Sequence, residues 1–205
     1  MTAYVARKAR NVLRRMLQQY GTSDLKKRLW NREFARGRWD CPERRPGDCV
    51  YPYVEKYARG GSILDLGCGS GNTGSELDAT RYRHYTGVDI STVAIEKARR
   101  RTEGNGASDR SRYVQSDIFS YVPSQPYDVI LFQDSIYYVP WRKITAMLGR
   151  YSKYLNEGGV FIVRMWDESD KYRSVVDIIE SAFEIVEKHL ADRPKAVVLV
   201  FRQRA

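Results

Sequence analysis

The segment "SILDLGCGSGNTG", residues 62–74, constrains the fold of this chain most, because a short apolar run leads directly into glycines. Four glycines fall within the eight residues 67–74. The apolar run predicts a buried strand, whereas glycines allow a sharp turn and let the backbone approach a ligand closely. The N-terminus of a following helix would offer free N–H groups to that ligand. The segment therefore predicts a binding loop between a strand and a helix.

Signals for strands and helices alternate along the rest of the chain. Apolar runs predict strands near 62–66, 84–88, 112–116, 127–133 and 160–165, and helical periodicity predicts helices near 72–79, 91–102, 141–155 and 172–183. Such alternation predicts a parallel sheet with helices on both faces and ligands at the carboxyl ends of its strands. The segments "EIVEKHL" and "AVVLVFR" predict a C-terminal hairpin that adds an antiparallel strand near the edge. We therefore expect a doubly wound, mostly parallel, seven-stranded α/β sheet.

The positive charge of the chain is concentrated at its N-terminus. The whole sequence has 35 Lys and Arg against 25 Asp and Glu, and residues 1–45 hold 13 of the former and 4 of the latter. The remainder is therefore nearly neutral. Residues 4–20 place seven apolar side chains at helical spacing, with basic residues opposite: Val5, Ala9, Val12, Leu13, Met16, Leu17 and Tyr20. This pattern predicts a basic amphipathic helix.

The next part of the chain marks a domain boundary. We expect a second helix to begin at Asp24 and a short helix to span 50–57. Between them, the segment 39–49 is interrupted by proline and glycine, which favours a loop. The sequence therefore predicts a basic helical extension over 1–47 and a main domain over 48–205.

Composition narrows the class of protein. The three cysteines, Cys41, Cys49 and Cys68, are an odd number without the spacing of metal ligands, so neither a disulfide framework nor a zinc site is expected. No apolar run approaches the ~20 residues of a membrane span. The N-terminus lacks the apolar core of a secretory signal, which makes a cytoplasmic protein the default expectation. The two histidines, His84 and His189, fall at strand ends and are expected to be structural.

The glycine register resembles motif I of the class I S-adenosylmethionine (SAM) dependent methyltransferases, whose fold is Rossmann-like. Asp65 precedes Gly67, and glycine recurs at Gly69 and Gly71. Four further segments resemble later motifs of that family, in order: "YTGVDIS", "YVQSDIF", "YDVILFQDSIYYV" and "LNEGGVFIVR". A nicotinamide enzyme is the alternative, because Gly69, Gly71 and Gly74 also satisfy G-x-G-x-x-G. In that fingerprint, however, the first glycine follows the strand immediately, which favours the methyltransferase.

The resemblance implies a SAM cofactor and a set of residues that bind it. Asp89 would accept hydrogen bonds from the ribose hydroxyls, and Asp117 from the adenine amino group, with Ile118 against the ring. The expected cofactor-binding residues are Asp65, Gly67, Cys68, Gly69, Gly71, Asn72, Asp89, Ile90, Ser116, Asp117, Ile118 and Gln133. Cys68 is expected to be a small buried residue and not a nucleophile. We expect Ser91 to cap the helix that follows Asp89.

The segment 133–138 faces the expected reaction zone and bears on the acceptor. It lacks the "[DN]-P-P-[YFW]" sequence of enzymes that methylate exocyclic amines of nucleic acids. It is weakly similar to the nodulation-factor N-methyltransferases, whose counterpart reads approximately "S-E-V-L-Y-Y-L". The resemblance therefore implies transfer of a methyl group to oxygen or nitrogen of a small molecule or sugar.

Two residues of this segment are catalytic candidates. Asp134 could orient or deprotonate the acceptor, or could be an ordinary solvated or capping carboxylate. Tyr137, with Tyr138, could line the acceptor pocket or serve only for packing. Asp134 and Asp167 could hold a metal as in catechol-type methyltransferases, but Gln133 stands where that family has an acidic residue, so no metal is expected.

The N-terminal extension has several interpretations. Trp30, Phe34 and Trp39 could fold over the cofactor and exclude water, with Arg36 or Arg38 reaching a carboxylate, or could anchor the extension to the core. The basic helix 4–20 could pack on its own domain or on a partner subunit, the interpretation we favour, or contact an anionic membrane surface. It could also contact the phosphates of an RNA acceptor, which we do not favour. A SAM-binding protein without catalysis is a further alternative.

Overall fold

The computed structural model describes residues 2–39, 47–103, 108–166, 172–192 and 195–204. A seven-stranded sheet has the order β3-β2-β1-β4-β5-β7-β6. Its strands are β1 Ser62–Leu66, β2 His84–Asp89, β3 Ser111–Gln115, β4 Tyr127–Gln133, β5 Leu155–Trp166, β6 Glu184–Asp192 and β7 Lys195–Arg202. Neighbours among β1 to β5 are parallel, and β7 is antiparallel to both β5 and β6. The predicted fold class and C-terminal hairpin are confirmed.

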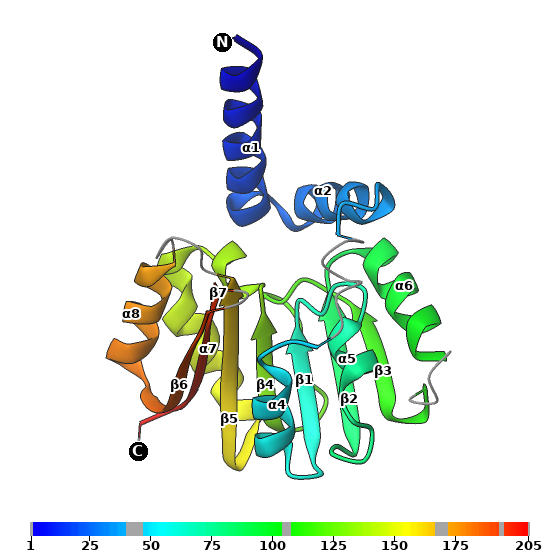
Figure 1. The fold of residues 1–205 in the computed structure, drawn as a ribbon, viewed down its shortest axis with the longest axis vertical. Helices are drawn as coiled ribbons and strands as arrows, with labels where there is room; N and C mark the ends of the chain where they lie inside the picture. The colour runs from blue at the N-terminus through cyan, green and yellow to red at the C-terminus, as the bar shows by residue number, and fades with distance from the viewer. Residues whose placement is uncertain (1, 40–46, 104–107, 167–171, 193–194, 205) are drawn as a thin grey trace.

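Helices cover both faces of the sheet (Figure 1). On one face the apolar core involves α4 Tyr51–Ala58 and α6 Thr92–Glu103, with α5 Asn72–Glu76 beside them. On the other face it involves α7 Ile144–Tyr151 and α8 Arg173–Ala182. Both faces are apolar because successive residues of a strand point to opposite sides: in β7, Val198 and Val200 join one core, and Leu199 joins the other.

Two predicted elements have different bounds. The helix predicted over 141–155 is divided into the 3₁₀ turn Trp141–Lys143, α7, and the 3₁₀ turn Ser152–Tyr154. Leu155 is already extended and begins β5, five residues before the predicted strand. A register shift between Tyr127 and Val129 of β4 accommodates this early start. The helix predicted over 72–79 ends at Glu76, because Leu77 is extended.

The N-terminal extension lies at the carboxyl ends of the parallel strands. In Figure 1, α2 Ser23–Ala35 lies across that end of the sheet and α1 Thr2–Tyr20 projects away from it. The N-cap of α2 is Thr22, whose hydroxyl accepts a hydrogen bond from the N–H of Leu25 at 3.4 Å. The helix begins at Ser23, so the predicted start at Asp24 is one residue late. Further 3₁₀ turns lie at Ser108–Arg110 and Ile136–Tyr138. In the part of the chain that the structure describes, none of the helices combines the length and apolar character of a membrane span.

Most of the predicted boundary segment 39–49, together with Cys41 and Asp167, lies outside the described residues. His84 begins β2 and is exposed, and His189 lies on the edge strand β6. Their places on these strands are as expected, and their structural role stays a prediction. Cys68 is buried in the loop after β1, and burial raises the pKa of its thiol well above the usual value, as expected of a small packed side chain.

Candidate functional site

A cavity of about 840 Å³ lies at the carboxyl ends of the parallel strands, beneath α1 and α2. Its volume is in the range of pockets that bind small organic ligands. Twelve of the fourteen site residues predicted from the sequence line it: Asp65, Gly67, Cys68, Gly69, Asn72, Asp89, Ile90, Asp117, Ile118, Gln133, Asp134 and Tyr137. They meet there because the carboxyl ends of parallel strands share one edge of the sheet.

The other two predicted residues, Gly71 and Ser116, are not among the lining residues. A Cβ on Gly71 would come within 2.8 Å of the Cβ of Ala98, so this glycine allows the loop to pack against α6. The N–H of Ser116 donates to the backbone oxygen of Asp89 at 2.9 Å and joins the two strand ends. The structure thus gives Gly71 a packing contact and Ser116 a backbone hydrogen bond, and their contact with the cofactor stays a prediction.

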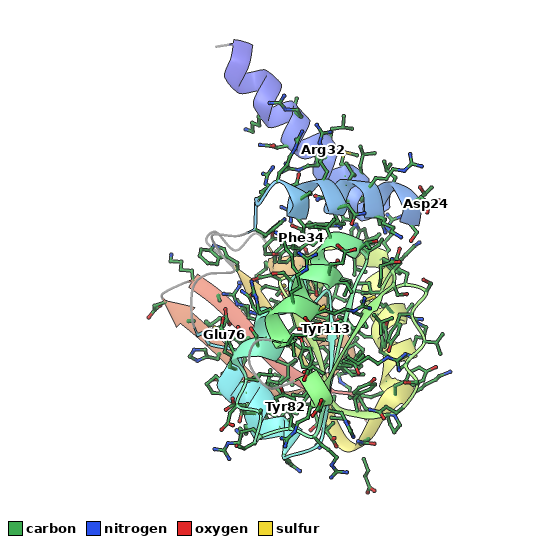
Figure 2. The ribbon with its side chains drawn as sticks, turned by 90° about the vertical axis from the view of Figure 1, so that its right-hand side faces the viewer. Asp24, Arg32, Phe34, Glu76, Tyr82 and Tyr113 are labelled. Atoms are coloured by element: carbon green, nitrogen blue, oxygen red, sulfur yellow. The ribbon has the colours of Figure 1, made fainter. Side chains whose placement is uncertain are left out.

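Two glycines of the loop after β1 lie beside the cavity in conformations that favour glycine. Gly67 and Gly69 have φ values of 90° and 54°, which disfavour residues with a side chain. A Cβ on Gly67 would lie 2.4 Å from the Cβ of Ser135, and one on Gly69 would lie 3.5 Å from the ring of Phe34. Phe34 lies on the side of α2 that faces the domain, as Figure 2 shows, with Arg32 on the opposite side.

Asp89, at the end of β2, is fixed by backbone donors. One carboxylate oxygen accepts from the N–H of Gly69 at 3.1 Å, and the other from the N–H of Ser91 at 2.7 Å. The hydroxyl of Ser91 accepts from the N–H of Ala94 at 3.1 Å, so the predicted cap of α6 is confirmed. Since Ser91 supplies the cap, Asp89 remains at the cavity wall.

Asp117, after β3, is held by α2. Its Oδ2 accepts a hydrogen bond from the hydroxyl of Ser23 at 2.9 Å, and its Oδ1 accepts from the N–H of Phe119 at 3.0 Å. Lys26, one turn along α2, lies 4.7 Å from the ring centroid of Phe119. Burial lowers the pKa of Lys26, and the charge of Asp117 opposes that shift. The start of α2 therefore closes this end of the cavity.

Asp65 is a fully buried carboxylate in the cavity wall. Its Oδ2 accepts a hydrogen bond from the Tyr85 hydroxyl at 2.5 Å, whereas its Oδ1 is buried and has no partner. Burial raises the pKa of Asp65 to about 7, and the hydrogen bond from Tyr85 opposes that rise. A buried acceptor without a donor suits a ligand that brings an N–H or a positive charge.

Arg164 connects two carboxylates on the opposite side of the cavity. It lies in β5, its side chain is 3% exposed, and its guanidinium pairs with Asp48 at 2.9 Å and with Asp134. Asp134 has a φ of 51°, and its Oδ1 accepts from the N–H of Trp166 at 2.8 Å. Burial raises the pKa of Asp134, and the charge of Arg164 opposes that rise.

Sequence reasoning assigned no role to Arg164 or Asp48. A lone arginine within the apolar run "GGVFIVRMW" of β5 was a usable signal, because an isolated charge is rarely buried without a partner. Asp48 lies in a loop, and no sequence pattern there marks it as a site residue. Only the folded chain brings it to the guanidinium.

Aromatic side chains form the wall beside Asp134. Tyr137 stacks on Tyr172 with ring centroids 4.3 Å apart, and Tyr138 meets Trp30 edge-on at 4.8 Å. Arg15 of α1 donates to the Tyr172 hydroxyl at 2.8 Å.

The predicted lid residues Trp30, Phe34 and Trp39 all line the cavity. Neither Arg36 nor Arg38 is among the lining residues, and Arg38 pairs with Glu33 at 3.0 Å. The predicted contact of Arg36 or Arg38 with a carboxylate of SAM or of the acceptor stays a prediction.

The sequence profile of the family described as "Methyltransferase domain" matches residues 63–159. Two curated relatives are each 32% identical: trans-aconitate 2-methyltransferase of Enterobacter sp. over 123 residues, and the mRNA cap guanine-N(7) methyltransferase of Schizosaccharomyces pombe over 109 residues. The matches cover 60% and 49% of this chain, and 45% and 30% of those proteins. The chain thus matches less than half the length of either relative.

The fold is also similar to a solved structure. The N-methyltransferase NodS from Bradyrhizobium japonicum, crystallised with S-adenosylhomocysteine (SAH), superposes with a TM-score of 0.65 and 17% identity. The similarity covers 86% of this chain and 99% of NodS. The profile matches just under half of the chain, and together with the order of the strands it supports the resemblance to the class I SAM-dependent methyltransferases, whose fold this chain has.

Proposed function

We propose that the chain transfers a methyl group from SAM to an oxygen or nitrogen of a small-molecule acceptor, such as a sugar derivative. The observation that carries this proposal is a single cavity with two unlike halves. The glycine loop, Asp89 and Asp117 form one half, and aromatic rings with Asp134 and Arg164 form the other. A cofactor and an acceptor could therefore meet inside one cavity.

The residues of the first half fit SAM. The unpartnered oxygen of Asp65 suits the cationic amino group of its methionine part. Asp89 and Asp117 place carboxylate oxygens at the wall for ribose hydroxyls and an adenine amino group, with Ile118 beside the ring. When bound, SAM supplies a methyl group that is already activated by the sulfonium, so the protein needs chiefly to position the acceptor and exclude water.

The second half has the groups to position an acceptor. The stacked rings of Tyr137 and Tyr172 offer flat apolar faces, and Tyr138 adds another. Asp134 is held by Arg164 and by the N–H of Trp166, so its carboxylate has a fixed direction. We propose that Asp134 accepts a hydrogen bond from the acceptor's O–H or N–H and so orients its lone pair. Trp30 and Phe34 of α2 would exclude water above the reacting atoms.

The cofactor half is tested by calorimetry of SAH binding. Asp89→Ala should weaken SAH binding by at least about tenfold, because one aspartate supports both the loop and the ribose. Asp109→Ala, in an exposed 3₁₀ turn, is the matched control and should bind normally. If Asp89→Ala bound SAH like the wild type while remaining folded by circular dichroism, the assignment would be wrong.

The acceptor is tested by transfer of a labelled methyl group from SAM into fractionated extracts. Label should enter the small-molecule fraction and depend on Asp134. The conservative variant Asp134→Asn should retain SAH binding and lower kcat, because it disturbs the acceptor half alone. Label that enters RNA instead would replace the proposed acceptor class with a nucleic acid.

A further inference from the structure

Helix α1 has its apolar side turned outward. Val12, Leu13, Met16 and Tyr20 are 55 to 59% exposed, and their spacing places them on one side of the helix. Among the described residues, eight large apolar side chains are exposed, and these four are the only ones on a common helix face. Of the other four, Val186 and Leu190 lie on β6, Trp141 in a 3₁₀ turn and Val122 in a loop. We call Val12, Leu13, Met16 and Tyr20 the outer face of α1.

The polar side of α1 is the one that contacts the domain. Arg14 pairs with Glu33 of α2 at 3.3 Å, and Arg15 donates to the Tyr172 hydroxyl. Gln19 donates to the backbone oxygen of Val139 at 3.0 Å, and Gln18 is buried at the cavity wall. A helix that packs on its own domain normally turns its apolar side inward. Because α1 does the opposite, packing among the residues that the structure describes leaves the outer face uncovered.

The charge of α1 indicates what covers the outer face. The helix has five basic residues and no acidic residue. Lys8 and Arg10 are exposed and precede Val12 and Leu13 by four and three positions, so they lie beside the outer face. Basic side chains that flank an apolar strip are the pattern of helices that lie in the interface of an anionic bilayer, with their stems along the apolar region and their charges at the headgroups.

Two other partners fit less well. A second copy of the chain would place two α1 helices together, each with five positive charges and no acidic residue to offset them. RNA would use the basic residues but would leave four apolar side chains in water. An anionic lipid surface satisfies both the charges and the apolar side chains.

We propose that the outer face of α1, flanked by Lys8 and Arg10, binds the surface of anionic lipid bilayers. The helix projects from the end of the molecule where the cavity lies, so the rest of the domain leaves it accessible (Figure 1). Its inner side is also part of the cavity: Gln18 lines the wall, and Arg15 is bonded to Tyr172, which lines it as well. The lipid-bound helix therefore holds one wall of the cavity next to the headgroups.

The test is sedimentation of the full chain with phosphatidylcholine vesicles, with and without phosphatidylglycerol. The chain should sediment with the vesicles that contain phosphatidylglycerol and not with those of pure phosphatidylcholine. Binding to the anionic vesicles should fall as the salt concentration rises. Leu13→Glu should lower the partition coefficient by at least about tenfold, because it replaces an apolar side chain that enters the lipid with a charge. Leu190→Glu is the matched control: Leu190 is 65% exposed on β6, and this variant should bind like the wild type.

Two measurements keep the result unambiguous. Circular dichroism and SAH calorimetry should be the same for Leu13→Glu and the wild type, which shows that the variant folds. Light scattering after gel filtration reports the oligomeric state of both. The proposal is overturned if the wild type ignores anionic vesicles, if Leu13→Glu still binds them normally, or if Leu13→Glu instead dissociates a dimer of the wild type.

Discussion

Asp65 is the residue whose ionisation should respond most directly to an occupied cavity. Burial raises its pKa to about 7, so in the free protein near pH 6 this carboxyl is mostly protonated. The cationic amino group of SAH beside it would lower that pKa and release a proton. We therefore predict that SAH binding near pH 6 releases protons, measured by calorimetry in two buffers of different ionisation enthalpy. Asp65→Asn should abolish this release, and an unchanged release would place its source elsewhere.

The same shift predicts how the stability of the free protein depends on pH. The unfolded chain ionises Asp65 near its ordinary pKa of 3.8, whereas the folded protein keeps the proton until about pH 7. Between these values the unfolded state binds fewer protons than the folded state, so the free energy of unfolding falls as the pH rises. The stabilising contribution of Asp65 is therefore fully present below pH 3.8 and is lost as the pH rises through about 7. Asp65→Asn should therefore gain stability relative to the wild type as the pH rises over this range, in parallel urea titrations.

Arg164 is the residue on which the opposite wall depends. It is the shared partner of Asp48 and Asp134, and Arg164→Met would leave two carboxylates together without the guanidinium. Removing one partner of a buried ion pair destabilises proteins by about 3–5 kcal/mol. We predict a loss near the lower value, because both carboxylates keep some contact with solvent. Urea unfolding would measure it.

A double variant tests whether Arg164→Met loses stability because the carboxylates are left without a compensating charge. Asp134→Asn added to Arg164→Met should recover part of the lost stability, because it removes one of the two uncompensated charges. The loss in Arg164→Met should also shrink at low pH, because burial raises the pKa of Asp134 and favours its neutral form there. A loss that is equal at all pH values would mean that Arg164 acts through packing alone.

At the scale of elements, Gly71 joins the binding loop to α6. Its φ is 79°, and a Cβ at this position would lie only 2.8 Å from the Cβ of Ala98, so both features oppose a side chain. Gly71→Ala should therefore destabilise the protein by about 1–3 kcal/mol. Gly149→Ala is the matched control, because Gly149 lies in α7 with open space around it. That variant should be stabilised by about 0.5–1 kcal/mol in the same thermal unfolding measurement. Equal effects would contradict the packing role of Gly71.

Elements with a clear apolar run or hydrophobic periodicity could be predicted from the sequence, whereas the residues at which they begin and end often could not. Strands β1 and β4 occupy the predicted ranges, because short apolar runs are read directly from the sequence. The start of β5 was missed, since residues 155–159 become a strand only through pairing with β4 and carry little apolar signal of their own. The orientation of α1 was missed for a related reason. A helical period locates an apolar side but does not say which way the fold turns it.

At the scale of the whole molecule, topology made half of the site predictable. Residues that follow parallel strands must meet at one edge, so a motif on each strand end sufficed to place Asp65, Asp89 and Asp117 around one cavity. The other half depends on contacts between segments far apart in the sequence, such as Arg15 with Tyr172 and Ser23 with Asp117. No local pattern specifies such pairs, and only three-dimensional packing brings them together.

The cavity predicts a response of the whole molecule to its cofactor. A ligand that binds only the folded state stabilises it by about 2.7 kcal/mol at one hundred times its dissociation constant. For a chain of 205 residues this corresponds to a rise in melting temperature of about 5–10 °C. SAH should produce this rise in scanning calorimetry, whereas nicotinamide adenine dinucleotide at the same concentration should produce none. The reverse result would reinstate the dinucleotide alternative, because Gly69, Gly71 and Gly74 satisfy that fingerprint as well. The register favours SAH, because β1 ends at Leu66 and the first glycine of the dinucleotide fingerprint, Gly69, stands three residues later instead of following the strand directly.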